Sequence, residues 1–210
     1  MFLKFRLRYR ECKGALTRMK RFIKLFVILA AVLAAVCFVV RYTLNLPDEG
    51  GLTPVHLATL NGETDKVSLM LMAGARADAR TPDGLTPLHL ARTPDVVTVL
   101  HQRGARLDAR ANNGDTPLHS AALTELPDVV QRLIALGADV NARNGEKETP
   151  LHMAATTGDD RTTALLLAHG ADPRLRDAHG LTPGQVALRK NHSALAQALA
   201  KAERAAASRQ

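Results

Sequence analysis

One histidine recurs in each of four similar segments, and a recurring imidazole could bind a metal ion or transfer a proton. The four are His56, His89, His119 and His152. If each lies on a successive pair of packed helices, neighbouring histidines are about 8–10 Å apart. A zinc ion needs all of its ligand atoms within about 2.1–2.3 Å. The spacing therefore predicts a column of separate side chains and no metal site.

An arginine also recurs, six residues before the threonine of four TPLH-like motifs. These residues are Arg80, Arg110, Arg143 and Arg176. Because the repeats stack, these arginines are predicted to form a row along the fingers, the arginine ladder. The sequence leaves two interpretations of its role open. The guanidinium groups either are part of the repeat consensus and make the surface soluble, or they bind carboxylate or phosphate groups on a partner or on lipid headgroups. Asp83, Glu146 and Asp177 stand nearby and reduce the local positive charge.

Catalytic motifs are missing from the sequence after the apolar run. It has no Gly-x-Ser-x-Gly elbow, no phosphate-binding Gly-rich loop and no HExxH pair. Cys12 and Cys37 both lie in the first 40 residues, so no disulfide or thiolate site is expected beyond them. Asp159 and Asp160 are expected to begin a helix, where acids favour the dipole. We expect no enzyme and no cofactor.

Charge and aromatic residues are concentrated at the N-terminus. The chain has 210 residues and a formal charge of +8, but residues 1–24 hold nine of the basic residues and one acid. The remainder carries 19 basic and 19 acidic residues, so it has no field that would attract polyanions. All seven aromatic residues lie before residue 43, which leaves no base-stacking rings beyond it. Nucleic-acid binding is therefore not expected.

The TPLH-like motif marks an internal repeat. It begins at Thr53, Thr86, Thr116, Thr149 and Thr182, in steps of 33, 30, 33 and 33 residues. Thr can cap a helix that starts with Pro, and the apolar residues that follow have helical spacing. A glycine such as Gly137 can end a second helix in the left-handed conformation. Each unit thus predicts two helices whose apolar face only neighbouring units can bury.

These segments resemble the ankyrin repeat family, as in "DGLTPLHLA", "GDTPLHSAA" and "ETPLHMAATTGDDRTTALLLAHGAD". The resemblance implies an all-α solenoid of about five helix-turn-helix repeats with β-turn fingers, over residues 51–201. It also implies that the recurring histidine is structural and bonds the backbone near the turns. Residues 202–210 are expected to form a flexible tail.

Two repeats depart from the pattern. The second lacks three residues around Arg92, Thr93 and Pro94, which predicts a tight turn and a shifted or shortened second helix. In the third finger, Lys147 stands where other fingers have glycine, which predicts a different shape for that fingertip.

The resemblance also implies that partners bind the fingertips and the concave face of the inner helices. Without aromatic anchors, we expect modest affinity or a large, wet interface. The candidate fingertip residues are Arg80, Pro82, Asp83, Arg110, Asn112, Asn113, Arg143, Asn144, Glu146, Lys147, Arg176 and His179. The candidates on the concave face are Leu60, Leu123, Thr124, Thr156 and Thr157.

Residues 22–42 predict one N-terminal transmembrane helix. The uncharged run from Leu25 to Val40 is about 24 Å long as a helix, and extension to Phe22 and Tyr42 gives about 31 Å, enough to span. Lys24 would reach back to the headgroups, and Tyr42 would sit at the other interface. Because basic residues stay cytoplasmic and only Arg41 closely follows the span, residues 1–21 are expected to be a cytoplasmic leader. Residues 43–50 are expected to be a hinge.

The expected function is protein binding at a membrane. The composition suggests a bacterial inner-membrane protein with a periplasmic ankyrin domain that is a scaffold, inhibitor or maturation aid for a periplasmic or membrane partner of unknown identity. Two alternatives stay open: a secreted module whose leader is cleaved, and a cytoplasmic-side adaptor in inverted orientation.

Overall fold

The computed structural model describes residues 26–27 and 29–208, and the chain divides after Thr43 into two units. In the first unit, residues 26–27 and 29–43 are helical and exposed, including Val40, Arg41 and Tyr42. The rings of Phe38 and Tyr42 stack with centroids 6.4 Å apart. Within the described residues, no helix has both the length and the apolar character needed to cross a bilayer. The expected leader 1–21, and Lys24 and Leu25, lie outside the described residues.

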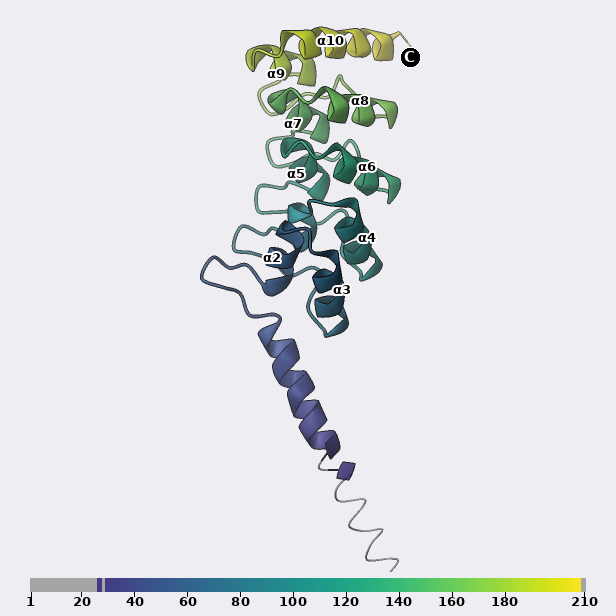
Figure 1. The fold of residues 1–210 in the computed structure, drawn as a ribbon. Coiled ribbons are helices and arrows are strands. Elements are labelled where there is room, and N and C mark those ends of the chain that lie inside the picture. The colour runs from purple at the N-terminus through teal and green to yellow at the C-terminus, as the bar shows by residue number, and fades with distance from the viewer. Residues whose placement is uncertain (1–25, 28, 209–210) are drawn as a thin grey trace, which may run out of the picture. The chain divides into compact units, whose positions relative to one another are not determined.

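The second unit, residues 44–210, stacks five pairs of helices, each pair an inner helix followed by an outer helix (Figure 1). The inner helices are α2 (Pro54–Leu60), η1 (Pro87–Leu90), α5 (Pro117–Leu123), α7 (Pro150–Thr157) and α9 (Pro183–Arg189). The outer helices are α3 (Thr64–Met72), α4 (Pro94–Gln102), α6 (Pro127–Ala135), α8 (Asp160–Ala168) and α10 (Ser193–Ala207). The expected all-helical solenoid of five repeats is therefore present, without strands in the described residues.

The repeated motif sets where the helices begin and end. Each inner helix follows an extended threonine, as at Thr116 with ψ 165°, and begins with Pro. The missing N–H of proline is no loss there, because the first N–H groups of a helix have no intrahelical partner. After the outer helix of the third repeat, Gly137 has φ +100°, which confirms the predicted left-handed glycine.

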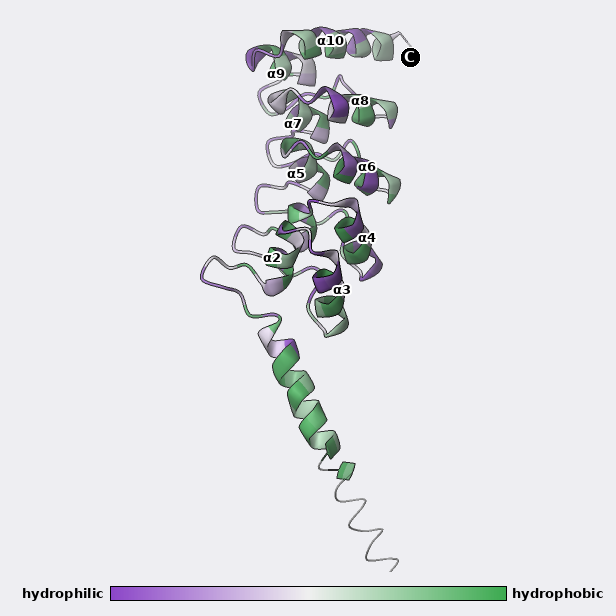
Figure 2. Cartoon of the chain, viewed as in Figure 1, coloured by the Kyte–Doolittle hydropathy of each residue, from purple (hydrophilic) through white to green (hydrophobic). Residues whose placement is uncertain are grey.

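The core is a ladder of equivalent positions from successive repeats. The residue two after each of the first four capping threonines is fully buried: Val55, Leu88, Leu118 and Leu151. The outer helices add Leu100, Leu133, Leu166 and Leu199, each at most 1% exposed. Figure 2 shows apolar and polar residues sharing each helix of the stack. A repeat therefore buries its apolar stripe only against its neighbours.

The shortened second repeat loses part of its inner helix and keeps its outer one. The inner element η1 is a single 3-10 turn of four residues, whereas α4 has the nine residues of its counterparts. Thr93 caps α4 by accepting a hydrogen bond from Val96 N at 3.4 Å. Of the two predicted alternatives, shortening of the second helix was wrong, because Val96, Val97 and Leu100 of α4 are all fully buried and hold it in place. The predicted shift is present, since α4 begins eight residues after its capping threonine, whereas the other nine-residue outer helices begin eleven residues after theirs.

The finger that carries Lys147 has the same turn as the others, contrary to expectation. Lys147 has φ +58° and donates its N–H to Asn144 O at 3.0 Å. Gly114, at the equivalent position, has φ +85° and donates to Ala111 O at 2.9 Å. Lysine thus adopts a conformation that favours glycine, because the hydrogen bonds of the finger fix it.

The expected hinge, residues 43–50, begins the first repeat. Leu44 packs against the core, and Asn45 binds both Gly74 O at 3.3 Å and Arg76 N at 2.9 Å. Asn141, 96 positions later, binds Gly170 O and Asp172 N in the same way. Asn45 is therefore a repeat residue rather than part of a linker.

The expected flexible tail, residues 202–210, is helical as far as Ala207. Helix α10 has 15 residues and continues to Ala207, whereas the other outer helices have nine. The tail was predicted too long because an Ala-rich sequence has high helix propensity and simply extends the last outer helix.

Lys147→Gly is expected to raise the free energy of unfolding by about 0.5–1 kcal/mol. A left-handed non-glycine residue costs about 1–2 kcal/mol, of which the greater unfolded-state entropy of glycine removes about 0.5–1. Gly180→Lys is the reciprocal variant: its φ is +77° with open space around it, so a comparable loss is expected. Urea unfolding measures both, and a destabilised Lys147→Gly protein would contradict the strain argument.

Candidate functional site

The four recurring histidines join each repeat to the next. Their side chains are at most 6% exposed. In each, Nδ1 accepts the backbone N–H of the capping threonine at 3.1–3.2 Å. The Nε2 atom lies 3.0–3.2 Å from a carbonyl oxygen of the following repeat: Leu85, Asp115, Glu148 and Leu181 in turn. Both ring nitrogens are used inside the solenoid, so the histidines are structural, as the family resemblance implied.

Burial sets the charge state of this column. Loss of solvent lowers the pKa of His56, His89, His119 and His152 below the ordinary value of 6.5, and the carbonyl acceptors only partly oppose this. The neutral form also fits the geometry, because a protonated Nδ1 could not accept the threonine N–H. Within the described residues, no group of three or more His, Cys, Asp or Glu side chains could hold a metal ion.

The arginine ladder also bonds the backbone. Arg80 Nη1 donates to Arg110 O at 2.7 Å and to Gly84 O at 3.2 Å. Arg110 Nη1 repeats this with Arg143 O at 2.7 Å and Gly114 O at 3.0 Å, and Arg143 Nη2 reaches Arg176 O at 2.6 Å. Arg176, in the last repeat, donates to Gly180 O of its own finger at 2.6 Å. These contacts support the structural interpretation of the ladder, because each guanidinium binds a backbone carbonyl oxygen of its own finger and the first three also bind one of the next finger.

Neighbouring fingers are also joined at their tips. Asn112 N donates to Asp83 O at 2.9 Å, Gly145 N to Asn113 O at 2.8 Å and Ala178 N to Glu146 O at 2.7 Å. In the finger before Thr86 the equivalent residue is Pro82, which has no N–H to donate to the preceding turn before Thr53. Pro82 instead packs so closely on Gly51 that a Cβ there would lie 2.3 Å from its ring.

Side chains inside the finger turns take no part in an exposed surface. Asp177 is 7% exposed, and its Oδ1 accepts the N–H groups of His179 and Leu181, both at 2.8 Å. Asn144 is half-buried and does the same for Glu146 and Glu148 at 3.0 and 2.8 Å. Such Asx turns fix the loop, so Asn144, a predicted fingertip contact, serves its own turn.

The other predicted fingertip residues are exposed on successive fingers. They are Arg80, Pro82, Asp83, Arg110, Asn112, Asn113, Arg143, Glu146, Lys147, Arg176 and His179. Leu123 and Thr124 are exposed as well, whereas Leu60, Thr156 and Thr157 are half-buried. The three threonine hydroxyls bond carbonyl oxygens of their own helices at 2.9–3.2 Å, which leaves mainly their methyl groups to a partner.

A cavity of about 350 Å³ shows which helix positions face the fingers. Its lining combines finger residues with residues of α7 and α9: Glu148, Thr156, Asp177, His179, Leu181, Val186, Arg189 and Lys190. Val186, Arg189 and Lys190 stand four, seven and eight residues after Thr182. The same positions in other repeats should face the same side because the repeat is regular. We call this surface the inner face: positions four, seven and eight of the inner helices, with the fingers beside them.

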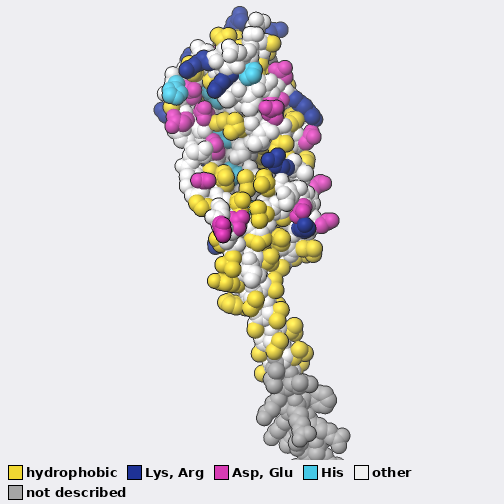
Figure 3. Space-filling view, turned by 60° about the vertical axis from the view of Figure 1, so that its left-hand side comes forward, with side chains coloured by type: hydrophobic (Ala, Val, Ile, Leu, Met, Phe, Trp, Pro, Cys, Tyr) yellow, Lys and Arg dark blue, Asp and Glu magenta, His cyan; other side chains and the backbone are white. Residues whose placement is uncertain are grey.

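The inner face changes character along the solenoid. In the early repeats it carries Leu57 and Leu123, which are 40% and 45% exposed. The short η1 ends at Leu90, four residues after Thr86, so positions seven and eight of that helix are missing. In the last repeat it carries Arg189 and Lys190, which form no ion pair within the described part of the chain. Figure 3 shows hydrophobic side chains gathered over the first repeats.

Sequence reasoning missed Leu57, Arg189 and Lys190. Leu57 is the fourth residue after its capping threonine, where Met153 is 7% exposed, so its exposure depends on the neighbouring repeat and not on its type. Arg189 and Lys190 are equivalent to Thr156 and Thr157, which were predicted. Counting from the threonine of the final, degenerate motif would have found both.

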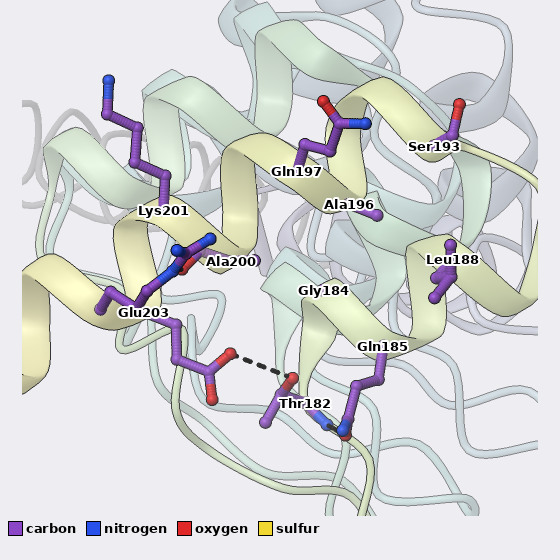
Figure 4. Close-up of a pocket in the computed structure, with 11 residues that line it drawn as sticks. Thr182, Gly184, Gln185, Leu188, Ser193, Ala196, Gln197, Ala200, Lys201 and Glu203 are labelled. Carbon is purple, nitrogen blue, oxygen red and sulfur yellow. Dashed lines mark hydrogen bonds between the residues drawn. The ribbon is translucent and has the colours of Figure 1, made fainter.

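A larger cavity, about 740 Å³, opens between α9 and α10 at the C-terminal end (Figure 4). Gln185 replaces the histidine there and accepts Thr182 N at 2.9 Å. Glu203 of α10 lies 3.5 Å from the Thr182 hydroxyl. This space is where a sixth repeat would stack, and small or polar side chains such as Gly184, Ser193 and Gln197 line it. It is the capped end of the solenoid.

Comparison with known families agrees with this geometry. The family model described as "Ankyrin repeats (3 copies)" matches residues 28–111, 74–144 and 124–208. The chain belongs to the ankyrin repeat family. No curated protein matches the chain. Ankyrin repeats are protein-protein interaction modules and are generally non-catalytic, and no enzyme family is indicated.

The ankyrin solenoid is expected to lose stability as the pH falls below about 7. Unfolded histidines bind protons near pH 6.5, while the lowered pKa of the four buried histidines keeps them neutral when folded. The unfolded state then binds more protons, so stability decreases by up to about 1.4 kcal/mol per pH unit for each histidine. Urea unfolding between pH 8 and about pH 5 measures this.

His119→Gln is the matched control, because Gln185 already fills this position in the last repeat. Its pH slope should be smaller, by at most about one proton, in the same range. Equal stability of the unaltered chain at about pH 5 and pH 8 would contradict the neutral column.

Proposed function

We propose that this ankyrin protein is a membrane-tethered binding module that holds a protein partner on its inner face and fingertips. The N-terminal segment is the tether, in a bacterial inner membrane, with the leader in the cytoplasm and the solenoid in the periplasm. It acts as a scaffold, inhibitor or maturation aid for a periplasmic or membrane protein, and catalyses no reaction. Membership of the ankyrin family supports protein binding in general. The exposed side chains of the inner face and the composition of the N-terminal segment support the binding surface and the tether.

The observation that carries the proposal is a set of exposed side chains on a backbone fixed by hydrogen bonds. The histidine and arginine contacts join each finger to the next repeat, so the inner face has little freedom to lose on binding. Binding to a preorganised surface saves the entropy of ordering loops. Exposed leucines on that surface, Leu57 and Leu123, then supply apolar area that a partner could remove from water.

The chemistry of the inner face suggests the chemistry of the partner. Its early repeats offer leucines, and its last repeat offers Arg189 and Lys190 beside His179. The acids lining the nearby cavity are already engaged: Glu148 Oε2 accepts Asn144 Nδ2 at 3.0 Å, and Asp177 holds its own turn. A segment with apolar residues toward one end and acidic residues toward the other would complement both.

The tether is supported by composition alone. Residues 22–42 have the length of a membrane span, and nine of the basic residues precede residue 25. The strong difference in basic charge on the two sides of the span favours a cytoplasmic leader and a translocated solenoid.

Leu57→Asp and Leu123→Asp are expected to weaken partner binding at least about tenfold each. An unpaired carboxylate in an apolar contact costs more than about 1.4 kcal/mol. The measurement is photo-crosslinking in intact cells with a photoreactive residue at position 120, which is position four of the inner helix that carries Leu123. The yield of crosslinked partner is the readout.

A photoreactive residue at Gln131, exposed on outer helix α6, is the control position. Ala164→Asp, on the exposed side of α8, is the control substitution. The inner-face proposal fails if the same proteins crosslink equally from positions 120 and 131, or if Ala164→Asp lowers the yield as much as Leu123→Asp does.

Protease added to spheroplasts should digest the solenoid and leave a tag on the leader intact, because the basic leader stays in the cytoplasm. The membrane fraction should contain a protein of the full mass, 22.6 kDa. Full protection of the solenoid would favour the inverted adaptor, and a shorter soluble protein would favour the cleaved, secreted module. A cytoplasmic enzyme that survives the treatment shows that the inner membrane is intact.

A further inference from the structure

The first outer helix, α3, has an uncovered apolar side at the N-terminal end of the solenoid. Leu69 and Met72 are 65% and 64% exposed. At the position of Leu69, the later repeats have Val99, Arg132 and Leu165, which are all half-buried. Arg132 reaches back to the preceding repeat, where its Nε donates to Thr98 Oγ1 at 2.8 Å. Leu69 therefore points toward the place of a preceding repeat, and α3 is the first outer helix.

The polar residues of this end are arranged unevenly. Glu63 and Asp65 lie at the start of α3, where Glu63 pairs with Lys66 at 2.9 Å. The other end of α3 carries Met72 and is followed by the exposed Arg76. We call Leu69, Met72 and Arg76 the end face. It combines two apolar side chains with a guanidinium, and the acids of α3 lie at the helix's opposite end.

Only a short stretch of chain connects the predicted span to the first repeat. Asn45 is bonded to Gly74 O and Arg76 N, so it is fixed to the first repeat. Tyr42, the last residue of the span, is three residues before Asn45, which is at most about 11 Å of chain. Met72 is only two residues before Gly74. If the span is embedded, no flexible linker separates the end face from the bilayer surface.

We propose that the end face lies in the interfacial layer of the bilayer, with Leu69 and Met72 among the upper acyl chains and Arg76 at the headgroup phosphates. Interfacial helices combine apolar and cationic groups in this way. The inference rests on the proposed tether and adds that the solenoid is seated on the membrane at one end and projects from it.

A lipid surface fits this face better than a second copy of the chain does. Two copies in one membrane would carry the same end toward the bilayer, so their end faces could not meet head-on. The guanidinium of Arg76 also suits a phosphate, because its planar donors bind phosphate oxygens in pairs.

The test uses the full chain with Cys12→Ser and Cys37→Ser, reconstituted in vesicles of phosphatidylcholine and phosphatidylglycerol. Leu69→Cys and Met72→Cys carry an environment-sensitive fluorophore. Leu188→Cys is the matched control, because Leu188 is 62% exposed on α9 in the last repeat. We expect a blue shift at positions 69 and 72 relative to detergent solution, with loss of emission when lipids carry a shallow quencher, and neither change at position 188.

The possible outcomes distinguish the proposed contact of the end face with the bilayer, here called the seat, from the proposed membrane tether. If the protein does not float with the vesicles, the tether itself is wrong. If it floats but positions 69 and 72 respond as position 188 does, the tether stands and the seat is overturned. A blue shift at 69 and 72 without lipid quenching also overturns the seat, because it shows cover by protein. The Arg76→Gln variant should reduce quenching in vesicles containing phosphatidylglycerol, whereas Arg189→Gln should not.

Discussion

The hydrogen bond from each buried histidine to a carbonyl oxygen of the following repeat is the interaction on which the fingers and the inner face depend. It runs beside the arginine contacts, so every finger is fixed at its base by His119 or its equivalents and along its side by Arg110 or its equivalents. The histidine Nε2 atoms find their carbonyl partners only when a next repeat is present, and so does the second carbonyl contact of Arg80, Arg110 and Arg143. An unsatisfied buried polar group costs about 1–3 kcal/mol, so the repeats are held in register as well as in contact.

The same constraint separates what the sequence could predict from what it could not. Threonine, proline and glycine act locally, so the helices and the left-handed turn at Gly137 were predictable. The three-residue deletion was located correctly, but the helix that it shortens was not, because the core decides which helix gives way. The Lys147 finger was mispredicted for a similar reason: hydrogen bonds to Asn144 and Arg143 hold the turn whatever residue occupies it. Asn45 was assigned to a hinge because its partners, Gly74 and Arg76, lie about 30 residues away.

For the candidate site, the sequence identified the surface better than the roles within it. The fingertip residues are mostly exposed, but the arginines among them bind backbone carbonyl oxygens. Every residue has such an oxygen, so the sequence does not show which of them a side chain binds. The repeat register identified position seven of the inner helices in three repeats and position eight in two. It missed Leu57 at position four because the exposure of that position varies: Met153 is covered there and Leu57 is not. Such differences depend on neighbouring side chains, which a single sequence does not order in space.

The two ends of the solenoid solve the problem of the missing neighbour in different ways. At the C-terminal end, Gln185 replaces the histidine, Gly184 replaces the buried leucine, and α10 is six residues longer than its counterparts, although Leu188 there is 62% exposed. At the N-terminal end, Leu69 and Met72 remain apolar and exposed, although a polar residue there would cost nothing in the core. Terminal repeats normally need a polar outer face for solubility. The predicted span directly precedes the first repeat in the sequence, so the exposed Leu69 and Met72 of that repeat are expected to have an apolar neighbour.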